Sequence, residues 1–247
     1  MLYLIVGAGQ LRHLFKCAVV ALIALATCGV QLAQASVVLS GTRIIYNGKK
    51  KEVTVTVTNN NKSPVLIQNW IDAGMAKAVP EKVSVPFVLT PPINRVDAGK
   101  AQTLRITYLG SPPLPKDKES IFWVNVLEVP AKAKGVKEDQ SRLNIAFRSR
   151  IKLFYRPEGL KGNSLQAISQ LQWQPAKDGV NVTNPTPYYV SLQVIQYGGK
   201  IIDGKMIAPG ETQHYKFPGI GSVTDVTKIT YHAINDYGAL TSAQPKK

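Results

Sequence analysis

The stretch LNIAFRSRIKLFY, residues 143–155, decides the fold more than any other part of the chain. Apolar residues dominate every second position from Leu143 to Tyr155, and a period of two is typical of a β-strand. At about 3.3 Å per residue this strand would be roughly 43 Å long, about twice the usual length. A small domain covers only part of it, so we expect the half near Leu143 to project an apolar row beyond the core.

Two interpretations of that row remain open from the residues alone. In the simpler one, Leu143, Ile145 and Phe147 are buried in their own domain. In the other, they line an exposed edge strand, which is normally a liability and therefore implies a partner. Such an edge can be donated to another polypeptide, with main-chain hydrogen bonds giving affinity and alternate side chains filling pockets.

Strand patterns continue on both sides of this stretch. Valine and threonine alternate over 53–58, and apolar residues alternate with polar ones over 104–108. The segment 156–162, RPEGLKG, is interpreted as a corner between two domains. Short strands bounded by Gly, Pro and Asn predict two antiparallel sandwiches. The strands expected after the corner are 165–173, 179–183, 188–196 and 229–234, and the three tryptophans, Trp70, Trp123 and Trp173, are expected in cores.

Composition and charge exclude several classes of protein. The 247-residue chain is 45% hydrophobic, which excludes a disordered chain, and its formal net charge of +15 suits a partner with acidic surfaces. Nucleic acid would be such a partner, but the basic residues do not cluster with aromatic ones on a nucleic-acid-binding motif. Three histidines and two cysteines are too few for a zinc site of the usual kind.

Residues 1–35 have the features of a secretory signal peptide. Basic residues precede an apolar run at 17–26, and Ala33-Gln34-Ala35 has the form of a cleavage site. The run is shorter than the roughly 20 apolar residues that span a membrane, and a lipid-anchor site at Cys28 fits the residues less well. Cleavage after Ala35 would leave no cysteine, so hydrophobic cores would have to hold the mature chain together.

Six motifs give the chain a resemblance to the periplasmic chaperones of the chaperone–usher pilus pathway. They keep their order through both domains and span nearly all of the mature chain, and the runs at 114–130 and 151–157 are the most specific. The motifs are GTRIIY (41–46), FVLTPP (87–92), LPKDKESIFWVNVLEVP (114–130), IKLFYRP (151–157), NPTPYYV (184–190) and INDYG (234–238). The short basic loop that follows Pro130 resembles the short-loop branch of the family.

The resemblance implies an all-β fold of two immunoglobulin-like domains joined at an angle, with boundaries that we place at 36–157 and 158–247. It implies that Arg43 and Lys152 bind the terminal carboxylate of a pilus subunit through charge-assisted hydrogen bonds. Without the motifs, solvated strand residues would be the simpler interpretation of both cations. The donor strand of the family is matched by Leu143, Ile145 and Phe147, and its interdomain ionic network by Glu119, Arg156 and Asp236.

The function implied by the resemblance is that of a periplasmic chaperone. It would fold and cap pilus subunits by donor-strand complementation and deliver them to an outer-membrane usher, with no cofactor and no metal. The free edge strand also leaves room for weak self-association.

Two other classes of protein fit the sequence less well. An enzyme would have to use His214 or His232, since no G-x-S-x-G, phosphate loop or metal spacing occurs. A pilin or a sugar-binding sandwich is the other alternative. A pilin needs an incomplete domain and an N-terminal donor arm, whereas this chain has two full strand sets and only Ser36–Ser40 ahead of its first motif.

Overall fold

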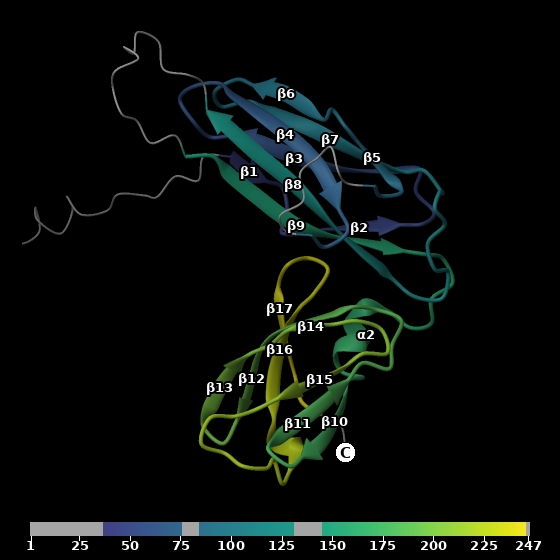
Figure 1. The fold of residues 1–247 in the computed structure, drawn as a ribbon, viewed down its shortest axis with the longest axis vertical. Helices are drawn as coiled ribbons and strands as arrows, with labels where there is room; N and C mark the ends of the chain where they lie inside the picture. The colour runs from purple at the N-terminus through teal and green to yellow at the C-terminus, as the bar shows by residue number, and fades with distance from the viewer. Residues whose placement is uncertain (1–36, 76–83, 131–144, 246–247) are drawn as a thin grey trace, which may run out of the picture. The chain divides into compact units, whose positions relative to one another are not determined.

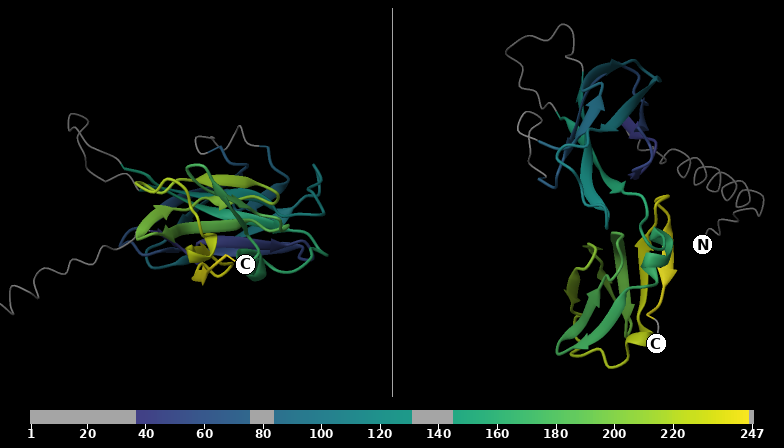
Figure 2. Two further views of the ribbon diagram at one scale, coloured as in Figure 1. Left: turned by 90° about the horizontal axis from the view of Figure 1, so that it is seen from below. Right: turned by 90° about the vertical axis from the view of Figure 1, so that its right-hand side faces the viewer.

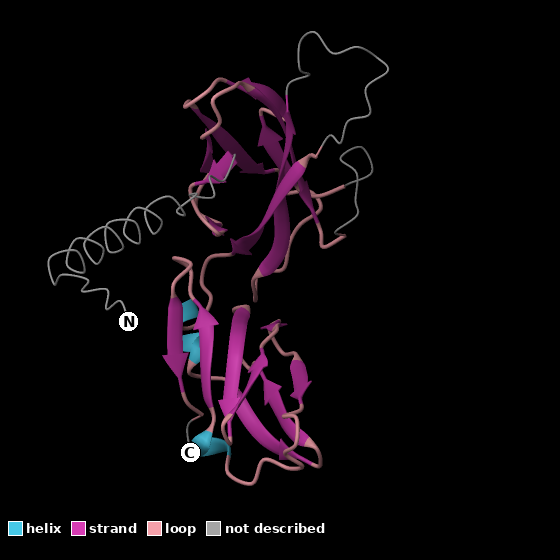
Figure 3. Cartoon of the chain, turned by 90° about the vertical axis from the view of Figure 1, so that its left-hand side faces the viewer, coloured by secondary structure: helices cyan, strands magenta, loops and turns pink. Residues whose placement is uncertain are grey.

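The structure is a computed structural model that describes residues 37–75, 84–130 and 145–245. Strands make up nearly all of its regular structure (Figure 3), and the helices of these residues are short, α2 (Ser164–Ile168) and η2 (Val226–Lys228). This confirms the prediction of an all-β chain. None of the helices in the described ranges has the length and apolarity needed to cross a membrane.

The first domain is a sandwich of two sheets (Figure 1). One sheet has the strand order β1-β3-β7-β5 and the other the order β2-β9-β8-β4-β6. The strands are β1 (Val37–Leu39), β2 (Arg43–Asn47), β3 (Glu52–Asn59), β4 (Val65–Asp72), β5 (Phe87–Thr90), β6 (Ile93–Val96), β7 (Ala101–Tyr108), β8 (Ser120–Pro130) and β9 (Phe147–Arg156).

The alternation seen in the sequence explains how these sheets face each other. In β3, Val55 and Val57 are buried in the core between the sheets, while the threonines between them face outward. The opposite sheet contributes Val124 from β8 and Leu153 from β9 to the same core. Figure 2 shows these sheets from two further sides. The alternating segments at 53–58 and 104–108 are therefore half-buried strands, as the sequence predicted.

The first strand of the sandwich changes sheet. β1 pairs antiparallel with β3, whereas β2, only a few residues later, pairs parallel with β9 in the other sheet. Ser40 ends the first pairing, since its N–H donates to Thr56 O and its Oγ accepts from Thr56 N. Because β2 begins only at Arg43, it borders the second half of β9 and leaves the first half uncovered on that side.

The second domain is a sandwich of its own, with sheets β10-β11-β15 and β13-β12-β16-β17, and β14 pairing with β12. Buried residues such as Trp173, Val182 and Tyr231 form a separate core. The strands are β10 (Gln172–Ala176), β11 (Gly179–Thr183), β12 (Val190–Tyr197), β13 (Lys200–Asp203), β14 (Met206–Ile207), β15 (Thr212–Tyr215), β16 (Thr230–Ile234) and β17 (Leu240–Ala243).

The strand expected at 165–173 is wrong over most of its length. Residues 164–168 form α2, and β10 begins only at Gln172. The helix starts because the side chain of Asn163 accepts a hydrogen bond from Gln166 N, which is an N-cap. Its last residues, Ala167 and Ile168, are buried in the core of the second domain, so a single turn satisfies both the cap and the core.

Trp70 and Trp173 are both buried, at 8% exposure, as expected, but only Trp173 belongs to the core cluster of its domain, and Trp123 is only partly buried. Trp173 belongs to the core of the second domain, but Trp70 and Trp123 alternate with core residues and so face outward from the sheet of β4, β8 and β9. Arginines of β9 lie over both rings, with Arg148 6.0 Å from Trp70 and Arg150 4.7 Å from Trp123. The outer face of this sheet is thus held by stacked arginines and tryptophans.

Arg150 also forms an ion pair that no sequence pattern indicated. Its Nη2 and Nε donate to Asp72 Oδ1 and Oδ2 at 2.6 and 3.1 Å, and Asn125 Nδ2 donates to the same carboxylate at 2.7 Å. Burial would raise the pKa of Asp72, but the hydrogen bonds from Arg150, Asn125 and Gly74 outweigh it and hold that pKa below its usual range. The pair ties β9 to β4 across β8.

Replacing Arg150 should therefore destabilise the first domain strongly. In Arg150→Met the Asp72 carboxylate stays buried without its cation, which we expect to cost about 3 kcal/mol in urea unfolding. Arg105→Met, at an exposed position of β7, is the matched control and should change stability by less than about 0.5 kcal/mol. Equal stability of the two variants would contradict a structural role for the pair.

Candidate functional site

The edge of β9 is paired over only half its length within the described part of the chain. β8 accompanies β9 from Phe147 to Tyr155, but β2 pairs with it only from Lys152 to Arg156. Residues 147–151 therefore have a neighbouring strand on one side and an open edge on the other. Unpaired N–H and C=O groups along such an edge are a template for a further strand.

The apolar row of the long strand continues past the core along this open edge. Ile151 and Tyr155 pack against the core and Leu153 is part of it, whereas Phe147 at the start of β9 is 63% exposed. Ile145, two residues before β9 begins, is 53% exposed, so the strand expected from Leu143 is wrong over 145–146. Leu143 lies outside the described residues. The enclosed interpretation left open by the sequence is thus wrong for Ile145 and Phe147, because neither side chain is covered by its own domain.

Arg43 and Lys152 lie side by side on the outer face of the same sheet. They are direct register partners in the parallel pair of β2 and β9, and each alternates with core residues such as Ile44 and Leu153. Arg43 Nη1 donates to Ile234 O at 2.9 Å, and Lys152 Nζ donates to Ser191 Oγ at 3.3 Å. The cations stand at the point where the open half of β9 ends.

The electrostatics of the two cations favour an anion between them. Burial lowers the pKa of Lys152, and the neighbouring charge of Arg43 lowers it further. Burial also lowers the pKa of Arg43, although Asp236 opposes the shift. Within the described part, Arg43 Nε is buried and has no hydrogen-bond partner. A carboxylate would relieve both the repulsion and the unsatisfied donor.

Ser191 belongs to this site, although no sequence pattern singled it out. It is a buried residue of β12 whose Oγ accepts from Lys152, and its register partner in β16 is Ile234, the residue whose carbonyl accepts from Arg43. A serine inside a strand carries no local signal of such a role. The motif NPTPYYV ends one residue before it, so a longer motif could have found it.

Arg156 contacts both carboxylates of the expected ionic network. Arg156 Nε donates to Glu119 Oε1 at 2.6 Å, and its Nη1 and Nη2 donate to the two carboxylate oxygens of Asp236 at 2.8 and 3.1 Å. Tyr189 N donates to Glu119 Oε2, and Ser164 Oγ donates to Asp236 Oδ2. Residues of both sandwiches therefore take part in the network.

The pKa values of the two carboxyl groups in this network are shifted by burial and by pairing with Arg156. Burial raises the pKa of Glu119 despite the nearby Arg156. Burial would also raise the pKa of Asp236, but hydrogen bonds from Arg156 and Ser164 outweigh it and lower that pKa. Arg43 binds the carbonyl of Ile234, two residues before Asp236. The hairpin between β16 and β17 therefore contacts both the Arg43–Lys152 pair and the ionic network.

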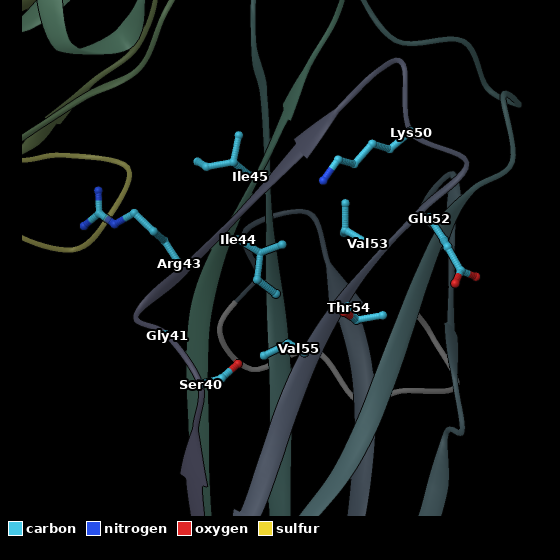
Figure 4. A pocket seen from close by; sticks show the side chains of 10 residues that line it. All are labelled: Ser40, Gly41, Arg43, Ile44, Ile45, Lys50, Glu52, Val53, Thr54 and Val55. Atoms are coloured by element: carbon cyan, nitrogen blue, oxygen red, sulfur yellow. The ribbon is translucent and has the colours of Figure 1, made fainter.

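A groove of about 360 Å³ lies between β2 and β3, where the first strand has changed sheet. Ile44, Val53 and Val55 line it together with Lys50 and Glu52. Figure 4 shows Arg43 directed away from Lys50 and Glu52, toward the loop drawn in yellow. The guanidinium of Arg43 thus binds the β16–β17 hairpin of the second domain and does not point into the groove.

No set of three or more His, Cys, Asp and Glu side chains that could hold a metal ion occurs among the residues that the structure describes. His214, the histidine of β15, contacts Asn181 through Nδ1 and Asp178 through Nε2, at 2.8 and 3.0 Å. These contacts join β15 to β11 and its preceding turn.

Comparisons with known proteins cover both domains. Residues 36–161 match the family "Pili and flagellar-assembly chaperone, PapD N-terminal domain", and residues 166–245 match "Pili assembly chaperone PapD, C-terminal domain". The probable fimbrial chaperone YadV of Escherichia coli K12 is 46% identical over 213 residues, which are 83% of this chain and 87% of the relative. The chaperone protein FimB/FhaD of Bordetella pertussis is 47% identical over 220 residues, 86% and 88% of the two chains.

The fold is also similar to a solved complex of Salmonella enterica, the SafA pilin with the SafB chaperone. The match has a TM-score of 0.71 and 30% sequence identity, and covers 84% of this chain and 94% of the other.

Proposed function

Because the chain belongs to the PapD family of pilus-assembly chaperones, we propose that it captures pilus subunits by donating part of β9 to them as a missing strand. The observation that carries this proposal is the open edge along 147–151, with exposed Phe147 at its start and the Arg43–Lys152 pair at its end. Ile145 and, beyond the described residues, Leu143 would extend the row of donated side chains.

The pairing of β2 sets the direction of the captured strand. β2 runs parallel to β9 and begins at Arg43, opposite Lys152. A client strand along 147–151 would occupy the same row as β2, immediately ahead of it. For its terminal carboxylate to reach both cations, the client strand must run parallel to β9. The anchor then fixes the register, since a slip of one residue would turn the client's side chains to the other face.

The remaining roles follow from the same assignment. Arg156, held by Glu119 and Asp236, would fix the junction between the proposed domains 36–157 and 158–247. Buried ion pairs of this kind add specificity of arrangement more readily than net stability. We further propose that the chaperone works in the periplasm after removal of residues 1–35, without catalysis or cofactor. It would belong to the short-loop branch and pass its clients to an outer-membrane usher.

The proposal is tested by recovery of subunits. The full chain, produced in the periplasm together with the pilus subunits of its source, should co-purify with them, and mass spectrometry should identify the partners. The complex should dissociate when a peptide that mimics the donor extension of another subunit is added. Recovery of the chaperone alone, with subunits stable in its absence, would overturn the proposed function.

The affinity for a client carboxylate should depend on pH through Lys152. Its pKa in the free protein lies below the ordinary 10.5, and only its charged form attracts the anion. Affinity should therefore be constant while the pH stays below the lowered pKa and fall about tenfold per pH unit once the pH exceeds it. Calorimetry with a short peptide that ends in a free carboxyl group measures this slope.

Two controls accompany the pH measurement. The same peptide with a C-terminal amide should bind weakly and without the slope. In Lys152→Arg the cation stays charged over this range, so the alkaline loss should disappear. An identical slope in Lys152→Arg would assign the titration to another group.

A further inference from the structure

We propose that Tyr237 is a contact residue for the captured polypeptide, packing against an apolar or aromatic side chain near the client's carboxyl terminus. The inference rests on the proposed function and extends the site from the anchor cations to the β16–β17 hairpin, residues 235–239. Exposure, rigidity and position of the hairpin support it independently.

Exposure is the first observation. Tyr237 is 95% exposed, the largest exposed fraction among the big apolar and aromatic side chains of the described residues. Every other tyrosine in those ranges is buried or partly buried. Aromatic side chains carry a large apolar surface, so one that its own domain leaves uncovered gains stability when a partner covers it.

Rigidity is the second observation. The side chain of Asn235 holds the turn, because its Oδ1 accepts from Tyr237 N at 3.0 Å and from Ala239 N at 3.1 Å. The main chain closes the same turn, with Asn235 N donating to Ala239 O and Gly238 N donating to Asn235 O. Gly238 has a φ of +82°, which suits glycine. The backbone under the ring is thus ordered before any client arrives, and little entropy is lost on binding.

Position is the third observation. A Cβ added to Gly238 would lie 2.6 Å from Thr42 Oγ1, so the hairpin touches the residue directly before Arg43. On the other side of Tyr237, Asp236 binds Arg156, and Ile234 O accepts from Arg43. The residue after Tyr237 therefore lies against the start of β2, and the residue before it is fixed to Arg156, opposite the end of β2. The hydrogen bond from Arg43 to Ile234 O holds the base of the same hairpin beside the place where the client carboxylate is proposed to bind.

This position defines the part of the client that Tyr237 reaches. The client strand ends at Arg43 and advances about 3.3 Å per residue away from it. A tyrosine side chain spans about two such steps, so its partner should be one of roughly the last three client residues. An apolar or aromatic client side chain there would bury the ring, and aromatic contacts beside a fixed polar anchor are typical hot spots of interfaces.

The test uses Tyr237→Ala and Tyr237→Phe in the full chain, with Ile201→Ala as matched control. Ile201 is an exposed residue of β13, at the opposite edge of the sheet that contains β16 and β17. The probe is a short synthetic peptide of alternating valine and threonine with a free carboxyl end, in which one phenylalanine is moved through the last positions. Calorimetry should give about tenfold weaker binding for Tyr237→Ala and less than about threefold for Tyr237→Phe.

A double-mutant cycle locates the contact. The loss in Tyr237→Ala should shrink when the phenylalanine of the peptide is replaced by serine within the last three positions, and should be unaffected by phenylalanine further upstream. The thermal unfolding temperature of Tyr237→Ala should match that of the parent chain, because the exposed ring makes few contacts with its own domain. Unchanged peptide affinity, or coupling only to upstream positions, would overturn the assignment.

Failure of this inference is distinguishable from failure of the proposed function. If Tyr237→Ala binds normally while Lys152→Ala binds poorly, the anchor stands and the aromatic contact does not. If Lys152→Ala and the C-terminal amide peptide both bind normally, the anchor itself is wrong. If Tyr237→Ala weakens self-association in sedimentation but not peptide binding, the ring contacts a second copy, which also overturns the proposal.

Discussion

Lys152→Ala should lose client binding by about two orders of magnitude or more, while the chaperone itself remains folded. A charge-assisted hydrogen bond is worth about 1.5–3 kcal/mol, and the loss of this one also leaves the register of the client strand unfixed. The free protein should lose only a little stability, because the hydrogen bond to Ser191 Oγ disappears while burial and the charge of Arg43 already disfavour the charged form of Lys152. Pull-down of subunits and thermal unfolding measure the two quantities.

Arg43→Ala should have the same effect on binding, with some loss of stability because the hydrogen bond to Ile234 O disappears as well. Lys200→Ala, an exposed lysine of β13, is the matched control and should bind clients normally. If Lys152→Ala recovers subunits at the parent level, the two cations do not anchor the client.

Phe147→Glu and Ile145→Glu should abolish capture as completely as the anchor variants. Filling a client pocket with either side chain contributes about 1.5–3 kcal/mol, and a carboxylate forced into the same pocket adds a desolvation penalty of several kcal/mol. Both side chains are more than half exposed, so the stability of the chaperone should change by less than about 0.5 kcal/mol.

Ala146→Glu is the sharpest control for this experiment. Ala146 lies between the two apolar residues, is exposed and directly precedes β9. When a client strand pairs here and extends β9, successive residues point to opposite faces. A carboxylate at 146 therefore faces away from the client and should leave capture intact. Equal loss in Ala146→Glu and Phe147→Glu would mean that charge, not the alternation of the strand, governs capture.

The sequence was most informative where function depends on a local period or an uninterrupted motif. Alternation over 143–155 predicted a strand longer than its domain, and the structure leaves Ile145 and Phe147 uncovered. The motifs with Arg43 and Lys152 predicted two cations at one place, and the register of β2 on β9 puts them there. In both cases the residues concerned lie on strands, or within two residues of one, and the strands follow from a short pattern.

Other features depend on pairs of residues that are distant in the chain, and no pattern in one sequence reports them. Asp72 and Arg150 are 78 positions apart, and Lys152 and Ser191 are 39 apart. The helix α2 was missed for a different reason, since its single turn is set by the Asn163 cap and by burial of two residues, not by a periodic stretch. Trp70 and Trp123 were expected in cores because size alone does not tell the inner face of a sheet from a covered outer face.

The point at which the chain leaves β1 for β2 sets how much room a guest strand has. β2 begins opposite Lys152, so five described residues of β9, from Phe147 to Ile151, have no paired strand on that side. Had the first strand stayed beside β9 throughout, the domain would have completed its own sheet. If the chain had paired with β3 over more residues, Arg43 would not lie beside Lys152. The position of the crossing at Gly41 therefore determines how many residues of β9 can pair with a client strand.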